Sequence, residues 1–265
     1  MDKSATDRAA PGRELEGKTA LVTGGGRGIG SAMARRLAAA GAVVAVNYAG
    51  NHAAAAETVD AIAARGGEAF AVQAKIGEPG ENERLIAALD AEFARRVGHS
   101  GLDILVNNIG GGDYATILDS SEAVFDQTFG NNVRAPFLLT RALYHRLRDN
   151  GRVINISSTG SRLTDPGIIV YSMAKAAVEA FTRVLAQDLG ARGITVNAVS
   201  PGFTAGETNL HVTEDPELAK GVIDHTALRR FGQPEEVADI VYALASPLGR
   251  WITAQTIDAS GGFRL

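Results

Sequence analysis

The chain has 265 residues and a formal net charge of −4, with 45% hydrophobic and 21% charged residues. This is ordinary globular composition, and a doubly wound α/β domain reaches this length with one continuous core. The negative charge argues against nucleic acid or an anionic membrane as the main partner, and the lack of cysteine excludes disulfides, thiol nucleophiles and cysteine-based metal sites.

The first fifteen residues are polar, contain Pro11 and Gly12, and lack the apolar segment of a secretory signal. We therefore expect a flexible extension at residues 1–15 and a single domain at residues 16–265. The sequence has no apolar run close to the roughly 18 residues that cross a membrane. Its five histidines lie far apart, without the spacing of metal ligands. These features predict a cytoplasmic protein without a metal.

From residue 19 onward, short apolar runs alternate with longer helical stretches. The expected strands are Thr19–Thr23, Val43–Asn47, Ala69–Gln73, Asp103–Val106, Arg152–Ser157, Thr195–Val199 and Gln255–Ile257. The expected helices are Ser31–Ala40, Ala53–Ala64, Glu81–Arg96, Glu122–Leu147 and Ala174–Leu189. Strands separated by helices imply right-handed parallel crossovers, and almost wholly apolar strands indicate a sheet buried on both faces. The predicted fold class is therefore α/β, with one doubly wound domain.

Residues 203–230 form the longest stretch without a strong sheet signal, and they include Gly206, Pro216 and Gly221. A long connection after a late strand is more often functional or mobile than structural. We expect this stretch to act as a substrate-binding loop.

The first expected strand runs directly into the glycine-rich segment Thr23–Gly30 and then into a helix. Glycines at this place allow a tight turn and let backbone N–H groups approach a pyrophosphate at the helix N-terminus. A glycine cluster alone fits an ordinary turn, but its position between the first strand and its helix favours a dinucleotide site. The residues expected to contact the dinucleotide here are Gly24, Gly26, Arg27, Gly28, Ile29 and Gly30.

The end of the second expected strand indicates which dinucleotide binds. NAD enzymes usually place an Asp or Glu there to accept a hydrogen bond from the ribose 2′-hydroxyl. This chain has Asn47 and Tyr48 instead, and both are expected cofactor contacts. Arg27 can pair with a 2′-phosphate, with no nearby acid to repel that group, although a solvated loop charge is the alternative. NADP(H) is therefore favoured over NAD(H).

A second segment, Asn107-Asn108-Ile109-Gly110-Gly111-Gly112, follows the fourth expected strand. Its glycines would let the backbone pass close to the adenosine ribose, and the asparagine amides can tie adjacent strands together. Turn chemistry alone is the alternative for the two asparagines. Asn108 and Gly110 are expected cofactor contacts.

Tyr171 and Lys175 lie four residues apart at the start of an apolar-periodic helix, so both side chains project from one face. A free phenol has a pKa near 10, and an ammonium about 4 Å away is worth roughly 4 kcal/mol at an effective dielectric near 20. We therefore expect Lys175 to lower the phenol pKa by up to about three units. A pair of this kind by itself is more often structural than catalytic.

Two further residues strengthen the catalytic interpretation. Ser158 follows an expected strand at the edge where open α/β sheets gather their active sites, and its hydroxyl can hold a carbonyl oxygen while Tyr171 donates the proton. Ser157 is the rival, but the thirteen-residue spacing to Tyr171 favours Ser158. Asn132 lies inside the expected helix Glu122–Leu147, where it could bend the helix and hold a water that relays protons through Lys175.

In these motifs the sequence resembles the short-chain dehydrogenase/reductase family, over residues 17–262. The matching elements are Thr23–Gly30, Asn107–Gly110, Asn132, Ser158, Tyr171-x3-Lys175, Pro201-Gly202 and two closing segments at 230–236 and 251–262. The resemblance implies a Rossmann-type sheet of seven parallel strands in the order 3-2-1-4-5-6-7. It also implies a catalytic tetrad, and this consists of Asn132, Ser158, Tyr171 and Lys175. A homotetramer is implied as well, with the helices around Glu122–Leu147 and Ala174–Leu189 at its interfaces.

The family resemblance adds cofactor contacts from Tyr171, Lys175, Pro201 and Gly202, with Lys175 on the nicotinamide ribose. Three positions depart from the family pattern. Ile109 replaces an alanine, and the segment 74–76 lacks the acid that commonly touches the adenine. The threonine that usually holds the nicotinamide amide is Gly206 here, which leaves Thr204 or Thr208, and Thr204 is included among the expected contacts.

These features predict reversible hydride transfer between NADP(H) and a ketone or secondary alcohol, with Tyr171 as general acid and base. By resemblance the substrate is most like that of a 3-oxoacyl-[acyl-carrier-protein] or polyketide ketoreductase. A sugar, a steroid or another secondary-metabolite ketone stays open, because the segments Ile109–Tyr114, Thr159–Ile169 and 203–230 set that choice. A non-catalytic cofactor sensor is disfavoured by the intact tetrad. An enoyl reductase of the same family is disfavoured by the Tyr-x3-Lys spacing.

Overall fold

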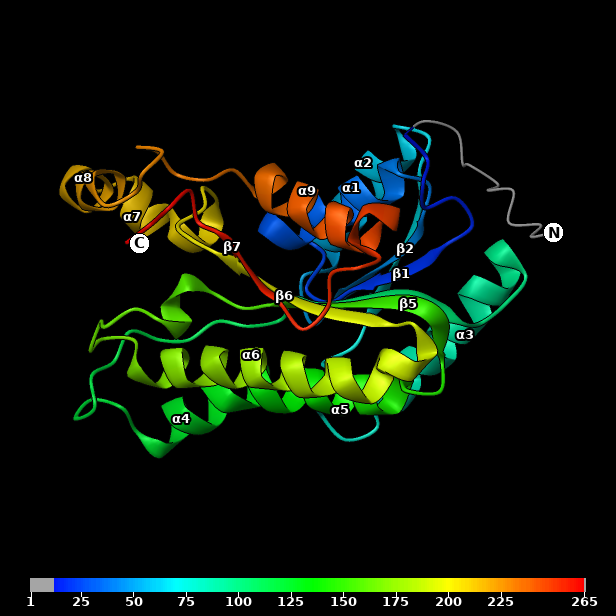
Figure 1. Ribbon diagram of the computed structural model, residues 1–265, viewed down its shortest axis with the longest axis horizontal. Coiled ribbons are helices and arrows are strands. Elements are labelled where there is room, and N and C mark those ends of the chain that lie inside the picture. Colours follow the sequence, from blue (N-terminus) through cyan, green and yellow to red (C-terminus); the bar gives the residue numbers. More distant parts are fainter. Residues whose placement is uncertain (1–11, 265) are drawn as a thin grey trace.

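The computed structural model describes residues 12–264, which form a seven-stranded sheet in the order β3-β2-β1-β4-β5-β6-β7 (Figure 1). All six neighbouring pairs are parallel. The strands are β1 (Thr19–Val22), β2 (Val43–Tyr48), β3 (Glu68–Gln73), β4 (Leu102–Asn107), β5 (Leu147–Ile156), β6 (Thr195–Pro201) and β7 (Thr256–Ala259). The predicted fold class and strand order are therefore confirmed.

Helices cover both faces of the sheet (Figure 1). On one face lie α1 (Gly28–Ala39), α2 (His52–Ala63) and α9 (Pro234–Ala245), and on the other lie α3 (Glu81–Val97), α5 (Ala135–Leu143) and α6 (Ile169–Leu189). Successive residues of a strand point to opposite faces. Ala20 and Val22 accordingly belong to the core beneath α1 and α9, while Leu21 belongs to the core beneath α3, α5 and α6. The two cores explain why the strand sequences are apolar without alternation.

The predicted single helix Glu122–Leu147 is wrong. The structure has α4 (Glu122–Phe129), a π-helical turn η1 (Gly130–Arg134) and then α5, while Leu147 begins β5. Two features favour the wider turn. Pro136 lacks an N–H group, and its ring disfavours a regular helix around the carbonyl four residues earlier. In addition, the Asn132 side chain donates to the Thr128 carbonyl at 2.8 Å. The turn therefore carries Asn132 at a local break of the regular helix.

The stretch 203–230 contains no named strand, as the sequence predicts, but it is not without structure. It forms a short turn, η4 (Glu207–Asn209), and two short helices, α7 (Leu210–Thr213) and α8 (Pro216–Asp224). Asp215 caps α8 by accepting hydrogen bonds from two backbone N–H groups. Figure 1 places α7 and α8 at the carboxyl ends of the strands.

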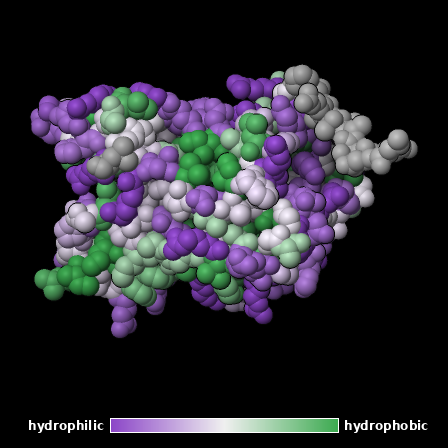
Figure 2. Space-filling view, in the orientation of Figure 1, coloured by the Kyte–Doolittle hydropathy of each residue, from purple (hydrophilic) through white to green (hydrophobic). Residues whose placement is uncertain are grey.

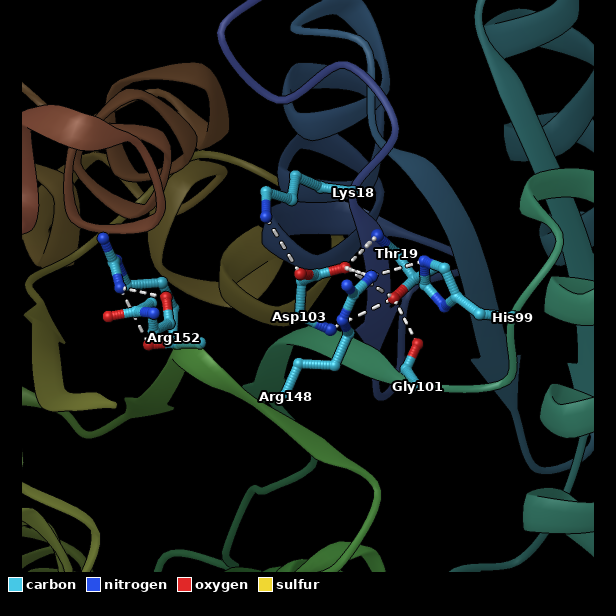
Figure 3. Close-up of polar contacts among 9 residues, drawn as sticks. Lys18, Thr19, His99, Gly101, Asp103, Arg148 and Arg152 are labelled. Atoms are coloured by element: carbon cyan, nitrogen blue, oxygen red, sulfur yellow. Dashed lines mark hydrogen bonds and ion pairs between the residues drawn. The ribbon is translucent and has the colours of Figure 1, made fainter. Parts of the chain in front are cut away.

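A polar network fixes the opposite, amino-terminal edge of the sheet (Figure 3). The buried carboxylate of Asp103 accepts from the Thr19 backbone N–H at 3.0 Å and from the Thr19 hydroxyl at 3.1 Å. Lys18 Nζ lies 3.1 Å from the same carboxylate, and Arg148 lies beside it. These bonds hold the start of β1 against the start of β4. This amino-terminal edge of the sheet has a structural role, and it lies at the opposite end of the strands from the glycine-rich turn.

The described part of the expected N-terminal extension, residues 12–15, packs against the domain. Leu15 is buried in the core, and Glu14 accepts a hydrogen bond from the Tyr242 hydroxyl at 2.8 Å. Residues 1–11, which make up the rest of that expected extension, lie outside the described residues. Among residues 12–264, none of the helices has the length and apolar character needed to cross a membrane.

Candidate active site

The glycine-rich segment forms a tight turn between β1 and α1. Gly24 and Gly28 have φ angles of +60° and +52°, which glycine adopts without strain. A Cβ on Gly30 would overlap the Gly24 carbonyl. α1 begins at Gly28, and Arg27, at its N-cap, makes no side-chain cap. The first-turn N–H groups, including that of Ile29, have no intrahelical acceptors and form an anion-binding end.

Two asparagines hold this turn in place. The Asn47 side chain accepts from the Gly24 N–H at 3.4 Å. It also donates to two carbonyls, that of Val72 in β3 and that of Ala74 just after β3. The Asn108 side chain donates to the carbonyls of Thr23 and Gly24 at 3.0 and 3.2 Å. Both amides are thus committed to the protein backbone. Asn47, an expected cofactor contact, supports the glycine turn through its side chain.

Other expected cofactor residues border the same turn. Gly26 packs against the start of α2, where a Cβ would lie 3.2 Å from the Ala55 nitrogen. Tyr48, at the end of β2, shares a 2.7 Å hydrogen bond with Nδ1 of His52. Lys75, at the position where the family commonly has an acid, lies 3.2 Å from the Glu78 carboxylate.

Arg27 lies at the predicted place, but its surroundings differ from the prediction. Its guanidinium is 3.0 Å from the carboxylate of Glu207, and both side chains are largely exposed. The expectation that no acid lies near Arg27 is therefore wrong. Glu207 belongs to η4, 180 positions along the chain, and sequence spacing gave no signal that it would reach the glycine turn.

Tyr171 is the third residue of α6, and its ring lies between two glycines. A Cβ on Gly112 would lie 3.0 Å from Cδ2 of the ring, and a Cβ on Gly160 would lie 3.0 Å from Cε1. Burial raises the pKa of the Tyr171 phenol, and a hydrogen bond with Ser158 opposes that rise. The two glycines thus let the main chain of two loops pass close to the edges of the ring, and Tyr171 stays partly exposed.

Lys175 is buried one helical turn further along α6. Its Nζ donates to the Ile156 carbonyl at 2.8 Å and lies 5.6 Å from the centroid of the Tyr171 ring. Burial lowers the pKa of Lys175 to about 8. The predicted downward shift of the Tyr171 pKa is therefore wrong for this structure, because burial outweighs the effect of neighbouring groups on the phenol.

Gly110 brings Asn132 and Lys175 together. A Cβ at this position would lie 2.5 Å from Oδ1 of Asn132 and 2.9 Å from Nζ of Lys175. The Asn132 side chain also donates to the Gly111 carbonyl at 2.6 Å and accepts from the Gly111 N–H at 3.2 Å. The π-helical turn therefore places the Asn132 side chain against the Gly110–Gly111 backbone, and Lys175 lies beside the same backbone.

The two candidate serines have different surroundings. Ser158 accepts from the Gly160 N–H at 3.0 Å and shares a hydrogen bond with Tyr171. Ser157 is buried and donates instead to Oε1 of Glu179 at 2.9 Å, an atom that also accepts from Ser161 at 2.6 Å. This geometry favours Ser158. Glu179, which brackets the Ser158 turn, was missed, although its spacing of four residues from Lys175 was a usable signal.

Pro201 ends β6, and Gly202 follows it, packed so closely on Ser260 that a Cβ would lie 2.7 Å from that side chain. Thr204 is buried, and its hydroxyl donates to the Gly202 carbonyl at 3.2 Å. This segment leads directly to Glu207. The described part of the chain thus holds Thr204 close to the end of β6, at the start of the predicted substrate-binding loop.

A cavity of about 860 Å³ lies between the sheet and the helices α5 and α6, behind the tetrad. Asn132 and Ile156, whose carbonyl accepts from Lys175, both line it. Asn107 also lines it, and its Oδ1 is buried without a hydrogen-bond partner among the described residues. The cavity is large enough for several waters, and Asn107, Asn132 and Asn155 supply hydrogen-bond partners for them in a mostly apolar lining.

Taken together, the glycine turn and the four predicted tetrad residues lie at the carboxyl edge of the sheet, where open α/β sheets bind ligands. Asn132, Ser158, Tyr171 and Lys175 come from three different segments, and glycines at 110, 112 and 160 let those segments meet. The arrangement can hold a dinucleotide beside a phenol, a hydroxyl and an ammonium. That combination suits proton transfer to a carbonyl oxygen.

A family model described as "Enoyl-(Acyl carrier protein) reductase" matches residues 24–264. The chain is 40% identical to a probable tetrahydroxynaphthalene reductase of Zymoseptoria tritici, over 93% of this chain and 94% of the relative. It is 39% identical to a 3-oxoacyl-[acyl-carrier-protein] reductase of Synechocystis, over 94% of this chain and 97% of the relative. Among solved structures, the angucycline C-6 ketoreductase LanV with bound NADP is 40% identical, has a TM-score of 0.90, and matches over 95% of this chain and 97% of LanV.

Proposed function

Because the chain belongs to the short-chain dehydrogenase/reductase family, we propose that it is an NADP(H)-dependent ketoreductase acting through Tyr171. The observation that carries this proposal is the meeting of Ser158, Tyr171 and Lys175 beside the glycine turn. The turn fits a dinucleotide, since its glycines leave no Cβ in the space before the α1 N-terminus. When bound, NADPH supplies the hydride that reduces the carbonyl carbon.

The roles of the tetrad follow from its contacts. Ser158 holds the carbonyl oxygen of the substrate by a hydrogen bond, beside the phenol. Tyr171 donates its proton to that oxygen, and its raised pKa keeps the phenol protonated until the oxygen gains negative charge. Lys175 stabilises the phenolate that remains and binds the nicotinamide ribose hydroxyls.

The proton that Tyr171 loses is replaced from behind the tetrad. Lys175 and Asn132 both face Gly110, and Asn132 and the carbonyl that holds Lys175 line the cavity. Waters in the cavity would carry a proton from solvent past Asn132 to Lys175. The buried, unpartnered Oδ1 of Asn107 supports this assignment, because such an atom normally has a water partner.

Two observations support NADP(H) as the cofactor. The end of β2 carries Asn47 and Tyr48 where NAD enzymes place a carboxylate. Arg27 extends from the glycine turn and can pair with a 2′-phosphate. Glu207 pairs with one guanidinium nitrogen of Arg27 and competes with that phosphate. The bound NADP of LanV agrees with this cofactor.

The substrate class that we propose is a polyketide-type ketone. The comparison proteins include a tetrahydroxynaphthalene reductase and an angucycline ketoreductase, and the name of the first specifies a fused aromatic ring system. A carrier-bound 3-oxoacyl chain is the second candidate, favoured by the Synechocystis reductase. A sugar or steroid ketone stays possible only if both of these fail as substrates.

The description of the matching family model favours one further activity, reduction of an enoyl thioester. The Tyr-x3-Lys spacing and the Ser158 hydroxyl beside the phenol argue against it, since both suit a carbonyl oxygen. A non-catalytic sensor of NADP(H) is the rival from another class, and the complete tetrad argues against it. The cytoplasmic location expected from the sequence stays a prediction.

The experiment that tests the proposal follows oxidation of NADPH and of NADH by absorbance. The substrates are 2-tetralone, a 3-oxoacyl thioester, an enoyl thioester, a sugar ketone and a steroid ketone. We expect turnover of a ketone with NADPH well above that with NADH. Turnover of the enoyl thioester alone would contradict the ketoreductase assignment. Tight NADPH binding without turnover of any substrate would favour the sensor.

A further inference from the structure

The loop between β4 and α4 is joined to the loop that leads into α6. The Ala115 N–H donates to the Gly167 carbonyl at 2.6 Å, and Ala115 forms a parallel bridge with Ile168. Asp165 accepts from the Gly167 N–H at 2.8 Å and from the Tyr114 hydroxyl at 3.4 Å. These bonds fix the two loops as one rim.

The aromatic ring of Tyr114 lies directly on Gly167. A Cβ at position 167 would overlap the ring, so only glycine allows this placement. The remainder of Tyr114 is open, with 75% of the residue exposed. The backbone at Gly167 thus supports one part of the ring, and the rest of the ring faces solvent as a flat surface.

This surface lies at the mouth of the candidate site. Gly112, two residues before Tyr114, lies so close to Tyr171 that a Cβ there would be 3.0 Å from the ring, and Gly167 precedes Tyr171 by four residues. Further exposed apolar side chains stand on the loop 203–230, at Leu210, Leu218 and Leu228. Figure 2 shows apolar surface at the end of the molecule that carries the β4–α4 loop. A mouth of this kind suits an apolar substrate.

We propose that Tyr114 is a specificity-determining residue, whose ring stacks on the fused rings of a planar ketone held at Tyr171. The inference rests on the proposed ketoreductase function and narrows its substrate class. An aromatic ring prefers an offset-stacked neighbour, which a fused-ring ketone offers and an acyclic acyl chain does not. Gly167 is the positioning residue for the ring, and Asp165 holds the Gly167 backbone.

The test compares two ketones and one ligand that cannot be reduced. The kinetic readout is the ratio of kcat/KM for 2-tetralone to kcat/KM for ethyl acetoacetate, with NADPH saturating. The binding readout is the Kd of 2-naphthol by calorimetry in the presence of NADP. Removing the ring in Tyr114→Leu should lower the ratio, and weaken naphthol binding, by about three- to tenfold.

Three further variants separate stacking from other effects. Tyr114→Phe keeps the ring and should keep the ratio within about twofold. Gly167→Ala should lower the ratio, because its Cβ displaces the ring. Leu118→Ala is the matched control, since it removes an apolar side chain that is 93% exposed on the same loop, and it should leave the ratio unaltered.

The outcomes distinguish this inference from the proposed function. An unchanged ratio and unchanged naphthol binding in Tyr114→Leu would overturn the stacking role while leaving the reductase in place. An equal loss in Leu118→Ala would also overturn it, because any apolar surface would then serve. A wild-type protein that reduces neither ketone would contradict the reductase, and weaker naphthol binding in Tyr114→Leu would still support stacking.

Discussion

Burial shifts the pKa values of Tyr171 and Lys175, the two proposed catalytic groups on α6, in opposite directions. Burial raises the pKa of the Tyr171 phenol and lowers the pKa of the Lys175 ammonium to about 8, because in both cases it disfavours the charged form. A neutral phenol is the form that donates a proton, and a charged lysine is the form that stabilises its phenolate. The proposed reaction therefore depends on the charge of Lys175 at working pH.

The pH dependence of reduction follows from this charge. Below pH about 8, Lys175 is charged, and above it the neutral form dominates. We expect kcat/KM for NADPH, which reports the free enzyme, to fall as pH rises through about 8. Unfolding does not explain such a fall, since a lysine with a lowered pKa makes folding more favourable as pH rises from about 8 towards 10.5. A profile that stays flat across that window would contradict the role of Lys175.

For single residues, the sequence predicted which side chains form the candidate site better than it predicted their burial and their neighbours. The tetrad and the glycines were identified from motifs, and the structure places Ser158, Tyr171 and Lys175 near one another. The direction of the Tyr171 pKa shift was wrong, because spacing along a helix gives no measure of burial. Glu207 was missed because its approach to Arg27 depends on how a distant loop folds.

Between elements, the ion pair of Arg27 and Glu207 connects the N-cap of α1 to η4 at the start of the loop 203–230. Such an exposed pair contributes little to stability. We expect its consequence to lie in binding, because the carboxylate pairs with one nitrogen of the guanidinium that we assign to the 2′-phosphate. If a phosphate displaces the carboxylate, we expect the link between Arg27 and η4 to be lost.

Glu207→Gln removes the competing charge and should tighten NADPH binding by about two- to fivefold, with NADH binding unaltered. Arg27→Ala should weaken NADPH binding far more than NADH binding, because only NADPH carries the phosphate. Fluorescence titration of both cofactors measures these constants. Equal changes for the two cofactors in either variant would rule out the phosphate contact.

The helices and strands also show what sequence patterns could and could not predict. Apolar runs located all seven strands to within a few residues, except that β5 begins five residues before its predicted start. The π-helical turn could not be predicted from periodicity, because its cause is the combination of Pro136 with the side-chain bond of Asn132. The same turn carries a tetrad residue, as local departures from regular structure often do.

At the scale of the whole molecule, the two-faced core and the strand order agree with the predicted fold, because parallel crossovers leave few arrangements. The fold of one chain does not test the predicted homotetramer. The outer faces of α5 and α6 carry exposed apolar side chains, with Phe137 50% exposed and Val184 72% exposed. We propose these faces as the subunit interface that the family resemblance implies.

Light scattering coupled to gel filtration should give the mass of four chains. Charged substitutions on the proposed interface, Phe137→Glu together with Val184→Glu, should reduce that mass, since each buries a carboxylate against a partner. A wild-type protein with the mass of one chain would refute the tetramer. A double variant that keeps the mass of four chains would refute the proposed interface.

We propose that this chain reduces a ketone with NADPH by protonation from Tyr171. Turnover of 2-tetralone by the wild type and by Tyr171→Phe, with NADPH binding measured for both, tests this role. We predict that the substitution lowers kcat by about a hundredfold or more while the Kd for NADPH changes little. A phenylalanine variant that retains near-normal kcat would contradict the claim, because its ring has no proton to give.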